Sequence, residues 1–299
     1  MSGIEDLPDR FPDVDYTRYS NRQLAAIPLG LLALALLILV GWSLFVTGSP
    51  AQPGAPVSMG IDFTGGTQAH IVTTDSLSEV KSQLGSAERV QSVVGGSGGQ
   101  NEYIVTLPPS VAHPTQRLSS AGYDVTSTNE IAASFGAGQV RLALIGILVA
   151  FLGMSIVIFV LFRTFVPSVA VIVSAFGDIV IPLALMNVLG IKLSLGTVAA
   201  LLMLIGYSVD SDVLLTNHIL RRRGGFYESA YRAMRTGVTM TLTSIAAMTV
   251  MAIVSYLLGM PLLPAIGLIL VMGLVTDLMN TYLLNLSLLR WYKYEGVTR

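Results

Sequence analysis

Six long apolar stretches alternate along the chain with polar segments. They cover roughly residues 25–47, 139–162, 167–190, 194–218, 237–258 and 262–287. Each is long enough to cross a bilayer, because a membrane-spanning helix needs about 20 predominantly apolar residues. Several contain Gly or Pro, which membrane helices tolerate, as at Pro182, Gly196 and Gly206. The pattern therefore predicts a polytopic α-helical membrane protein with six transmembrane helices.

A polar segment precedes the first span. Residues 1–24 carry five acids, namely Glu5, Asp6, Asp9, Asp13 and Asp15. A cleaved signal peptide instead has a basic region and an apolar core of only about 7–15 residues. We therefore expect residues 1–24 to form a cytoplasmic N-terminal segment and residues 25–47 to be a retained first helix.

The long polar segment 48–138 separates the first two spans. It opens with a Pro- and Gly-rich linker, TGSPAQPGAP, in which regular structure is not expected. Strand-like runs then follow at 67–74, 89–94, 101–107 and 122–128, with helix-like runs at 76–85 and 109–121. The order β-α-β-β-α-β predicts a small α+β domain of the ferredoxin-like type.

Composition agrees with a membrane protein. Only 12% of the residues are charged and 53% are apolar, whereas a soluble domain is about one quarter charged. The net charge of -1 gives no indication of a nucleic-acid partner. The absence of cysteine excludes disulfides and thiol catalysis, and the histidines His70, His113 and His218 have no metal-ligand spacing. We expect neither a metal site nor a cofactor.

The basic residues predict the orientation of the chain in the membrane. If the N-terminus is cytoplasmic, twelve Lys and Arg residues lie inside and five outside, as the positive-inside rule requires. Both termini, including the tail 288–299, are then cytoplasmic and the domain 48–138 is extracytoplasmic. The unit 139–287 would hold helices 2–6 and a basic amphipathic linker, 219–236, which lies along the inner membrane surface. The linker could also be an ordinary basic loop.

Four carboxylates fall within predicted spans: Asp178, Asp210, Asp212 and Asp277. Ionisable residues inside a membrane are costly, and they usually face the bundle interior and mark proton or ion paths. A buried structural hydrogen bond is the alternative for each of them. On the last helix, Asp277 shares a face with Asn280 and Thr281, three and four residues on, and Asn285 falls near that face.

Asp210 and Asp212 cannot serve the same purpose if the segment is a helix. Residues two apart on an α-helix point about 200° away from each other. Gly206 and Tyr207 lie on the side of Asp210, and Ser208 lies on the side of Asp212. We expect Asp210 to line a central path, and Asp212 to bond a neighbouring helix or to lie near the inner rim.

Three motifs resemble those of the SecD/SecF family of protein-export membrane proteins, which belongs to the RND superfamily. They are GIDFTGG (60–66), IGYSVDSDVLL (205–215) and, more loosely, EIAASFGAGQVRLAL (130–144). Six spans with one modest outer domain resemble the SecF branch, and the acidic N-terminal extension resembles its archaeal members. The resemblance implies a non-enzymatic subunit of the cell membrane that pairs with a SecD-like subunit. It also implies work beside a SecYE-type channel on unfolded exported polypeptides, using a gradient of H⁺ or Na⁺.

The resemblance also assigns roles to single residues. Bacterial SecF sequences read Gly-Tyr-Ser-apolar-Asn-Asp, which places the acid at Ser211, whereas SecD-type helices place it at Asp210. Asp210 is therefore the first candidate for the proton-linked acid and Asp212 the alternative. In the first motif, a structural role is expected for Asp62, through bonds to loop amides at the start of the domain. The same holds for the rest of that motif, Phe63, Gly65 and Gly66.

Two other classes of membrane protein are alternatives; the spans alone would equally allow a small-molecule or ion transporter, and outer-domain size and the GIDFTGG motif separate it from this chain. An RND-type transporter of small molecules or ions would have a much larger outer domain than the roughly 90 residues found here. An intramembrane aspartyl protease would need Gly-x-Gly-Asp, and the chain has AFGD at 175–178. We keep the small-molecule transporter as the alternative function.

Overall fold

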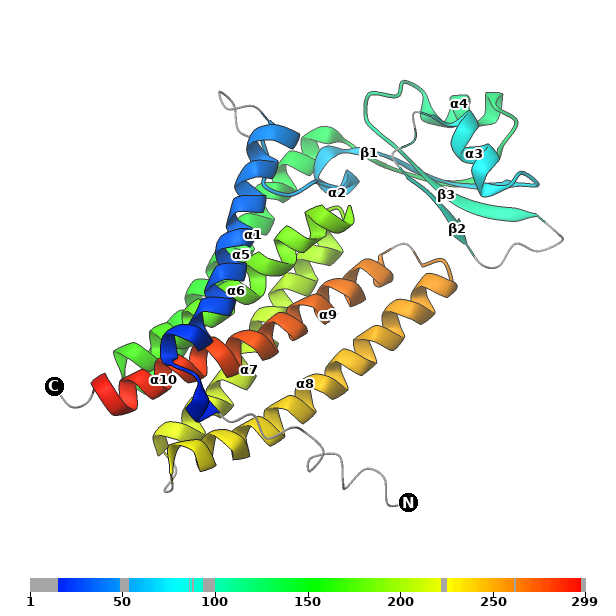
Figure 1. The fold of residues 1–299 in the computed structure, drawn as a ribbon. Helices are drawn as coiled ribbons and strands as arrows, with labels where there is room; N and C mark the ends of the chain where they lie inside the picture. Colours follow the sequence, from blue (N-terminus) through cyan, green and yellow to red (C-terminus); the bar gives the residue numbers. More distant parts are fainter. Residues whose placement is uncertain are drawn as a thin grey trace, which may run out of the picture.

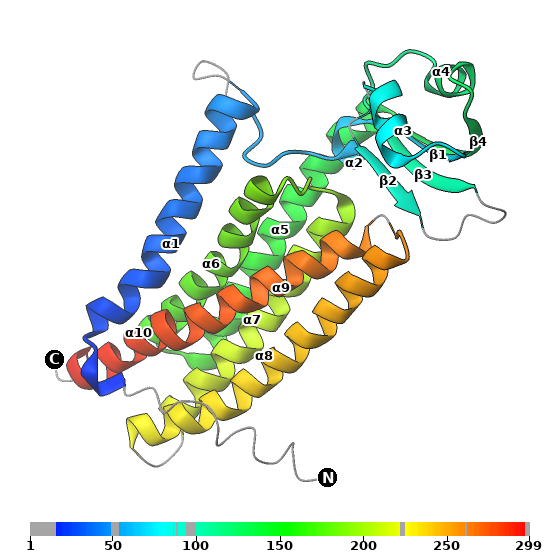
Figure 2. The same ribbon diagram turned by 45° about the vertical axis from the view of Figure 1, so that its right-hand side comes forward.

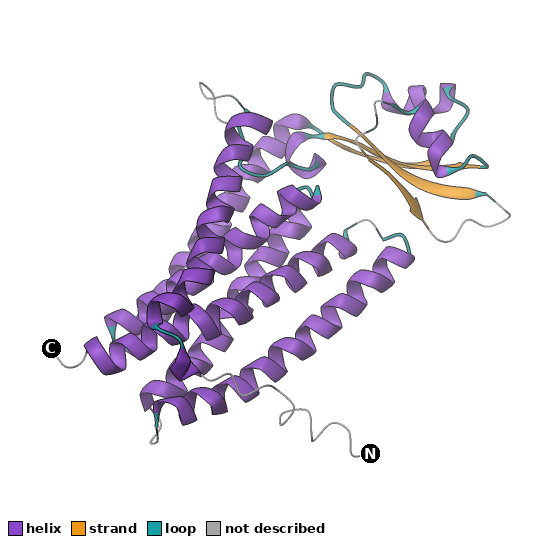
Figure 3. Cartoon of the chain, viewed as in Figure 1, coloured by secondary structure: helices purple, strands orange, loops and turns teal. Residues whose placement is uncertain are grey.

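A computed structural model describes residues 16–48, 54–85, 87, 89–93, 100–221, 225–260 and 262–296. A bundle of long helices carries one small α+β domain at one of its ends (Figures 1 and 2), and the strands found in the described part of the chain lie in that domain (Figure 3). Within the described residues, six helices are long and apolar enough to cross a membrane, which confirms the predicted fold class. The acids between Glu5 and Asp15 lie outside the described residues, as do Arg10, Arg222, Arg223 and Arg299.

The first span begins earlier than the apolar pattern indicates. It comprises α1 (Asn21–Gly41) and the π-type segment η3 (Trp42–Val46). Ser20 and Gln23 form a capping box: each side chain bonds the backbone N–H of the other residue, at 3.2 and 2.9 Å. This cap lets three polar residues enter the helix ahead of the apolar run.

The other five spans form the body of the bundle. They are α5 (Ala133–Phe162), α6 (Phe165–Leu189), α7 (Leu195–Arg221), α8 (Phe226–Leu257) and a last span that starts with α9 (Leu263–Met279). The last span continues through the π-type η4 (Asn280–Asn285), α10 (Leu286–Trp291) and η5 (Tyr292–Gly296). Helix α6 is the most enclosed, and it packs against α1, α5, α7 and α9.

The basic segment after α7 differs from expectation. Its described part from Phe226 onward forms the first turns of α8 rather than a separate surface helix. The apolar face of these turns, with Phe226, Ala230 and Ala233, is buried in a cluster that includes Tyr16 and Leu286. The apolar half of the amphipathic pattern is therefore explained by contact with protein.

The α+β domain has the order β1 (Gly66–Thr73), α3 (Leu77–Gln83), β2 (Arg89–Val93), β3 (Asn101–Leu107), α4 (Pro114–Ser120) and β4 (Asp124–Ile131). The antiparallel sheet has the strand order β2-β3-β1-β4. Helices α3 and α4 cover one face (Figure 2), and Ile71, Val80, Val105 and Leu118 are fully buried between the layers. This is the ferredoxin-like arrangement predicted from the order of the elements.

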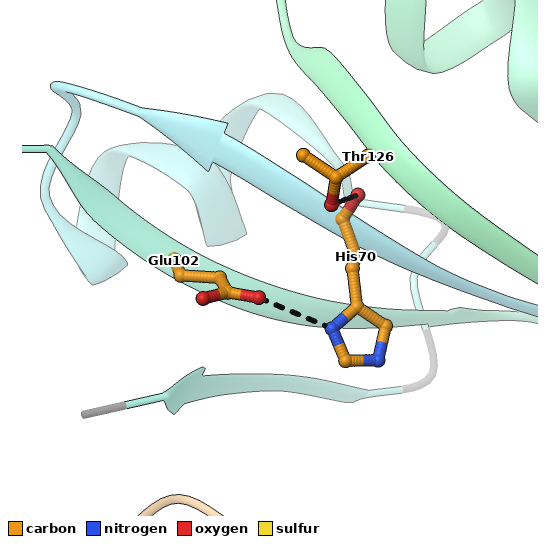
Figure 4. Close-up of polar contacts among 3 residues, drawn as sticks. All are labelled: His70, Glu102 and Thr126. Atoms are coloured by element: carbon orange, nitrogen blue, oxygen red, sulfur yellow. Dashed lines mark hydrogen bonds and ion pairs between the residues drawn. The ribbon is translucent and has the colours of Figure 1, made fainter. Parts of the chain in front are cut away.

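The face of the sheet that no helix covers carries polar side chains, and the edge strand β4 contains a β-bulge. The register between β1 and β4 shifts at His70, so that Thr126 has no partner residue, and its hydroxyl donates to the His70 carbonyl at 3.3 Å. His70 Nδ1 lies 3.3 Å from Glu102 Oε1 on β3 (Figure 4). These polar side chains keep the uncovered face hydrophilic.

The two ends of the described chain lie together, opposite the α+β domain (Figure 1). The Arg290 guanidinium donates to the carbonyls of Tyr16 and Tyr19 at 2.8 and 2.7 Å, and to the Asn21 side chain. Arg290 therefore ties the start of α1 to α10.

Candidate buried carboxylate cluster

Three carboxylates meet in the interior of the helix bundle. Asp178 comes from α6, Asp212 from α7 and Asp277 from α9; Asp178 and Asp277 lie near the middle of their spans and Asp212 lies in the C-terminal half of its span. Their exposed fractions are 1%, 0% and 2%. The same region buries Asn280, Thr281 and Asn285 of η4. The consecutive helices α6 and α7 and the last span thus contribute to one polar centre within an apolar bundle.

Asp178 is held by two donors. Ser208 Oγ donates to Asp178 Oδ2 at 2.6 Å, and Asn280 Nδ2 donates to Oδ1 at 2.6 Å. Since the donors come from α7 and η4, the carboxylate joins three elements. Both bonds are short, as charge-assisted hydrogen bonds are.

Asp212 and Asp277 share a donor. Thr281 Oγ1 lies 2.8 Å from Asp212 Oδ1 and 3.3 Å from Asp277 Oδ1. Asn285 Nδ2 donates to Asp212 at 2.9 Å, and the Ser211 hydroxyl lies 2.9 Å from both oxygens of Asp277. A hydroxyl has one proton, so Ser211 and Thr281 can each donate one bond at a time. Small rotations of these hydroxyls can therefore redistribute hydrogen bonds between the two acids.

The π-type turn explains how three polar residues of η4 reach the same centre. On a regular α-helix, Asn280 and Asn285 would point about 140° apart. A π-type segment has i→i+5 hydrogen bonds and more residues per turn, which brings residues five apart closer to the same side than an α-helix does. The polar stripe is visible in the sequence, but the wider turn that aligns it is not.

The cluster has no positive partner among the described residues, because neither Lys nor Arg bonds any of its carboxylates. Asp212 Oδ2 and Asn285 Oδ1 are buried without a hydrogen-bond partner. A buried uncompensated charge costs several kcal/mol. Three neighbouring buried carboxylates are therefore costly if all of them are ionised without a neutralising charge. Although the three carboxylates are neighbours, no group of three His, Asp or Glu side chains among the described residues is arranged so that it could hold a metal ion.

Asp210 lies outside this cluster. It is exposed and lines a cavity of about 180 Å³ between α7, α8 and α9, together with Tyr207, Ser211, Thr241 and Ser244. Asp212 bonds a neighbouring helix, as one of its two expected roles requires, and it lies in the interior. Asp210 differs from expectation, because it lies on an outer face and not on a central path. Gly206 is also exposed, whereas Ser208 is buried.

Known proteins with similar sequences place the chain in a family. A family model described as "Protein export membrane protein SecD/SecF, C-terminal" matches residues 113–295. The protein-export membrane protein SecF of Haloferax volcanii is 58% identical over 292 residues, covering 96% of this chain and 98% of the relative. The chain belongs to the SecF family. SecF of Pyrococcus furiosus is 36% identical over 284 residues, covering 92% of this chain and 93% of the relative.

Solved structures agree with the fold of this SecF-family chain. The crystal structure of SecDF from Thermus thermophilus, "a translocon-associated membrane protein", matches with a TM-score of 0.64 and 23% sequence identity. The match covers 91% of this chain but 38% of the SecDF chain. A second structure, SecDF in a super-membrane-facing form, matches with a TM-score of 0.57 and 22% identity. The SecF-family chain thus corresponds in fold to part of a longer SecDF chain.

Ser211, at the position of the acid in the bacterial motif, is part of the cluster. Its side chain contributes a hydroxyl to Asp277 instead of a carboxylate. The acid at this level of the bundle is therefore supplied by α9, with a second acid, Asp212, one residue further along α7. The displaced position in the motif was the one sequence signal that pointed to Ser211.

The GIDFTGG motif of the family forms α2 (Ile61–Thr64) and the turn into β1. Phe63 is buried, and Gly65 and Gly66 have φ angles of 77° and 139°, where residues with a side chain are strained. A Cβ on Gly66 would lie 2.6 Å from the Leu107 carbonyl oxygen. Asp62 accepts a bond from the Leu195 N–H at the start of α7, not from the amides of its own loop.

Proposed function

We propose that this SecF-family chain uses its buried carboxylate cluster to couple an ion gradient to polypeptide export. The chain is an auxiliary subunit of protein export that pairs with SecD. The observation that carries the coupling step is the burial of Asp178, Asp212 and Asp277 without a described positive partner. Such a centre changes its electrostatic energy strongly when it gains or loses one cation.

The proton is the better candidate for the coupling ion. Each carboxylate is already engaged by hydroxyl or amide donors, and the three do not converge as ligands around one point. Protonation of a carboxylate turns an acceptor into a donor. The unpartnered Asn285 Oδ1 and Asp212 Oδ2 provide acceptors to which rearranged hydroxyls could donate. Proton uptake would then rearrange bonds among α6, α7 and the last span.

The setting of this activity is also part of the proposal. Both ends of the described chain lie opposite the α+β domain, and the excess of basic residues is on the side of the ends. By the positive-inside rule the termini are cytoplasmic and the domain is outside. There the domain would contact the polypeptide as it leaves a SecYE-type channel. The exposed faces of the helices would contact membrane lipids.

Small-molecule transport by an RND-type half is the weaker alternative. The domain between the first two spans is a single four-stranded unit, which provides few residues to line a substrate-binding chamber. The similar proteins are named for protein export.

The test is secretion of a reporter by cells in which the gene is replaced by single variants. Asp178→Asn, Asp212→Asn and Asp277→Asn should each reduce secretion to that of cells lacking the gene, with normal subunit levels. Asn keeps the shape but cannot ionise. Ser255→Ala is the matched control, because Ser255 is buried in α8 and bonds its own helix backbone.

Asp210→Asn decides between the two candidate acids on α7. Normal secretion with Asp212→Asn together with loss with Asp210→Asn would restore the assignment expected from the sequence and overturn the role of the cluster. Loss with Asp212→Asn that Asp212→Glu partly restores would support a requirement for an ionisable group.

A further inference from the structure

A hydrogen-bonded contact joins the α+β domain to the start of the helix that carries Asp212. Asp62 Oδ2 accepts from the Leu195 N–H at 2.9 Å, across 133 residues of sequence. Beside it, Gly60 N–H donates to the Leu193 carbonyl at 2.7 Å, and Leu193 N–H donates to the Ser58 carbonyl at 2.8 Å. We call residues 58–62 and 191–195 the joint.

The joint is closely packed. Met59 and Leu193 pair as a parallel β-bridge, and a Cβ on Gly60 would lie 3.0 Å from the Leu193 carbonyl oxygen. On its other side, a Cβ on Gly136 at the start of α5 would lie 2.4 Å from the Phe63 carbonyl oxygen. The short helix α2 therefore lies between α5 and the α6–α7 loop, with little room to slide.

Asp62 does more for α7 than supply one acceptor. The first N–H groups of a helix have no partner within the helix, and the positive end of the helix dipole lies there. Ser194 Oγ already accepts from the Thr197 N–H at 3.1 Å, so the local cap satisfies a different amide. Asp62 adds a carboxylate from another part of the chain, so the two parts share one helix terminus.

The joint also has the right position to transmit movement. Asp62 is separated from β1 only by Phe63, Thr64 and Gly65, so the sheet and the motif are directly connected. In the other direction, Asp212 lies 17 residues after Leu195, about 26 Å along a continuous helix.

We propose that Asp62 is a positioning residue that couples the α+β domain to the carboxylate cluster through α7. The contact persists during the export cycle. A shift of α7 at the cluster therefore moves the α+β domain, and a force on the domain is transmitted to the cluster. That the cluster at the other end of this link is the ion site rests on the proposed function. The mechanical link between the α+β domain and α7 does not.

The link is tested without any export assay. The chain contains no cysteine, so cysteines introduced at Ser119 on α4 and Leu257 at the end of α8 take spin labels specifically. In lipid nanodiscs, Asp62→Ala should broaden the distance distribution between the labels. Asp124→Ala, which removes an exposed acid on β4, should leave it unchanged. An unchanged distribution with Asp62→Ala would overturn the mechanical link, whatever the function of the cluster.

A disulfide across the same joint tests the coupling. Opposed residues of neighbouring strands lie roughly 5 Å apart, a separation that a disulfide can span. Met59→Cys with Leu193→Cys, added to Asp62→Ala, should restore secretion when oxidised and lose it again on reduction. If Asp62→Ala merely unfolded the protein, the subunit level would be low in both the oxidised and the reduced state.

The same cysteine pair in the chain with Asp62 present should leave secretion normal when oxidised. A block of secretion there would mean that the joint has to open, which contradicts a persistent contact. Failure of the disulfide to rescue Asp62→Ala, with normal subunit levels, would also overturn the coupling role. If the carboxylate variants export normally while Asp62→Ala does not, the proposed ion site fails and the joint stands.

Discussion

Single atoms decide the geometry of the carboxylate cluster. Gly177 on α6 has no side chain at the point where Asn280 reaches Asp178, and a Cβ there would lie 2.7 Å from Asn280 Nδ2. The glycine thus leaves space for the amide that donates to Asp178. Its role is steric, since it lies inside a regular helix and not at a turn.

Gly177→Ala is therefore expected to displace the Asn280 amide and break its bond to Asp178. Loss of a hydrogen bond to a charged buried group costs about 1.5–3 kcal/mol, which should lower the midpoint of thermal unfolding in detergent. Gly153→Ala on α5 is the control, because a Cβ there meets nothing within 4 Å. Equal melting midpoints for the two variants would show that Asn280 adapts without loss.

Outside the membrane spans, Tyr16 reports how tightly the N-terminal side is packed. Burial, with a smaller contribution from Tyr231, raises the pKa of Tyr16 to about 12. A raised tyrosine pKa stabilises the fold below the unfolded pKa of about 10 and loses this stabilisation as the pH rises toward 12.

Stability should consequently fall between pH 10 and 12, the pH range that the pKa of Tyr16 sets. Ionisation of Tyr16 accounts for about 3 kcal/mol at most of this loss in the free energy of unfolding. In Tyr16→Phe the fall should be smaller. Thermal unfolding of both chains at pH 9 and at pH 11.5 measures it. Tyr19→Phe, at an exposed tyrosine nearby, should behave like the original chain.

At the scale of the elements, glycines set how closely the helices approach. Gly267 and Gly273 lie on α9, where it crosses α8 and α7. A Cβ on Gly267 would lie 2.9 Å from Ala252 Cβ and 3.0 Å from the Met248 carbonyl oxygen. Close contact through small residues is a main source of helix association in membranes, where the hydrophobic effect does not draw helices together.

Gly267→Ala should separate α8 from α9, because its nearest neighbours include backbone that cannot rotate away. Overpacking of this kind costs roughly 1–3 kcal/mol. Hydrogen exchange should increase along α8 and leave α6 unchanged. Gly146→Ala on α5, where a Cβ meets nothing within 4 Å, is the matched control. Unchanged exchange along α8 would contradict a requirement for close contact.

For the whole molecule, Asp210 indicates where the SecD partner lies. A carboxylate facing lipid near the middle of a span costs at least about 3 kcal/mol. Asp210 is exposed in the single chain, beside Tyr207 and the polar residues Thr241 and Ser244 of α8. This face of α7 and α8 is thus expected to be covered by protein, and SecD is the partner.

A photo-crosslinking amino acid in place of Tyr207 should capture the SecD-like subunit in native membranes. The same amino acid in place of Val157, which is exposed on α5, should not. Capture from position 157 and not from 207 would place the partner on the opposite face.

The sequence by itself determined the number of spans, the small α+β domain and the family. Hydrophobic length, period-two strands and short motifs are local properties, and each is readable without knowing what a segment contacts. It also singled out four intramembrane acids, of which Asp178, Asp212 and Asp277 meet in one cluster. Helical periodicity correctly separated Asp210 from Asp212, because a difference of 200° depends only on the helix.

Only the tertiary structure decided which of those two faces is the interior. The choice depends on where α6 and α9 pack against α7, and no local pattern encodes that direction. The same is true of the π-type turn that aligns Asn280 with Asn285, and of the bond from Asp62 to Leu195. These features join residues tens to more than a hundred positions apart, or depend on a small change in helix pitch, so they exist only once the helices have packed.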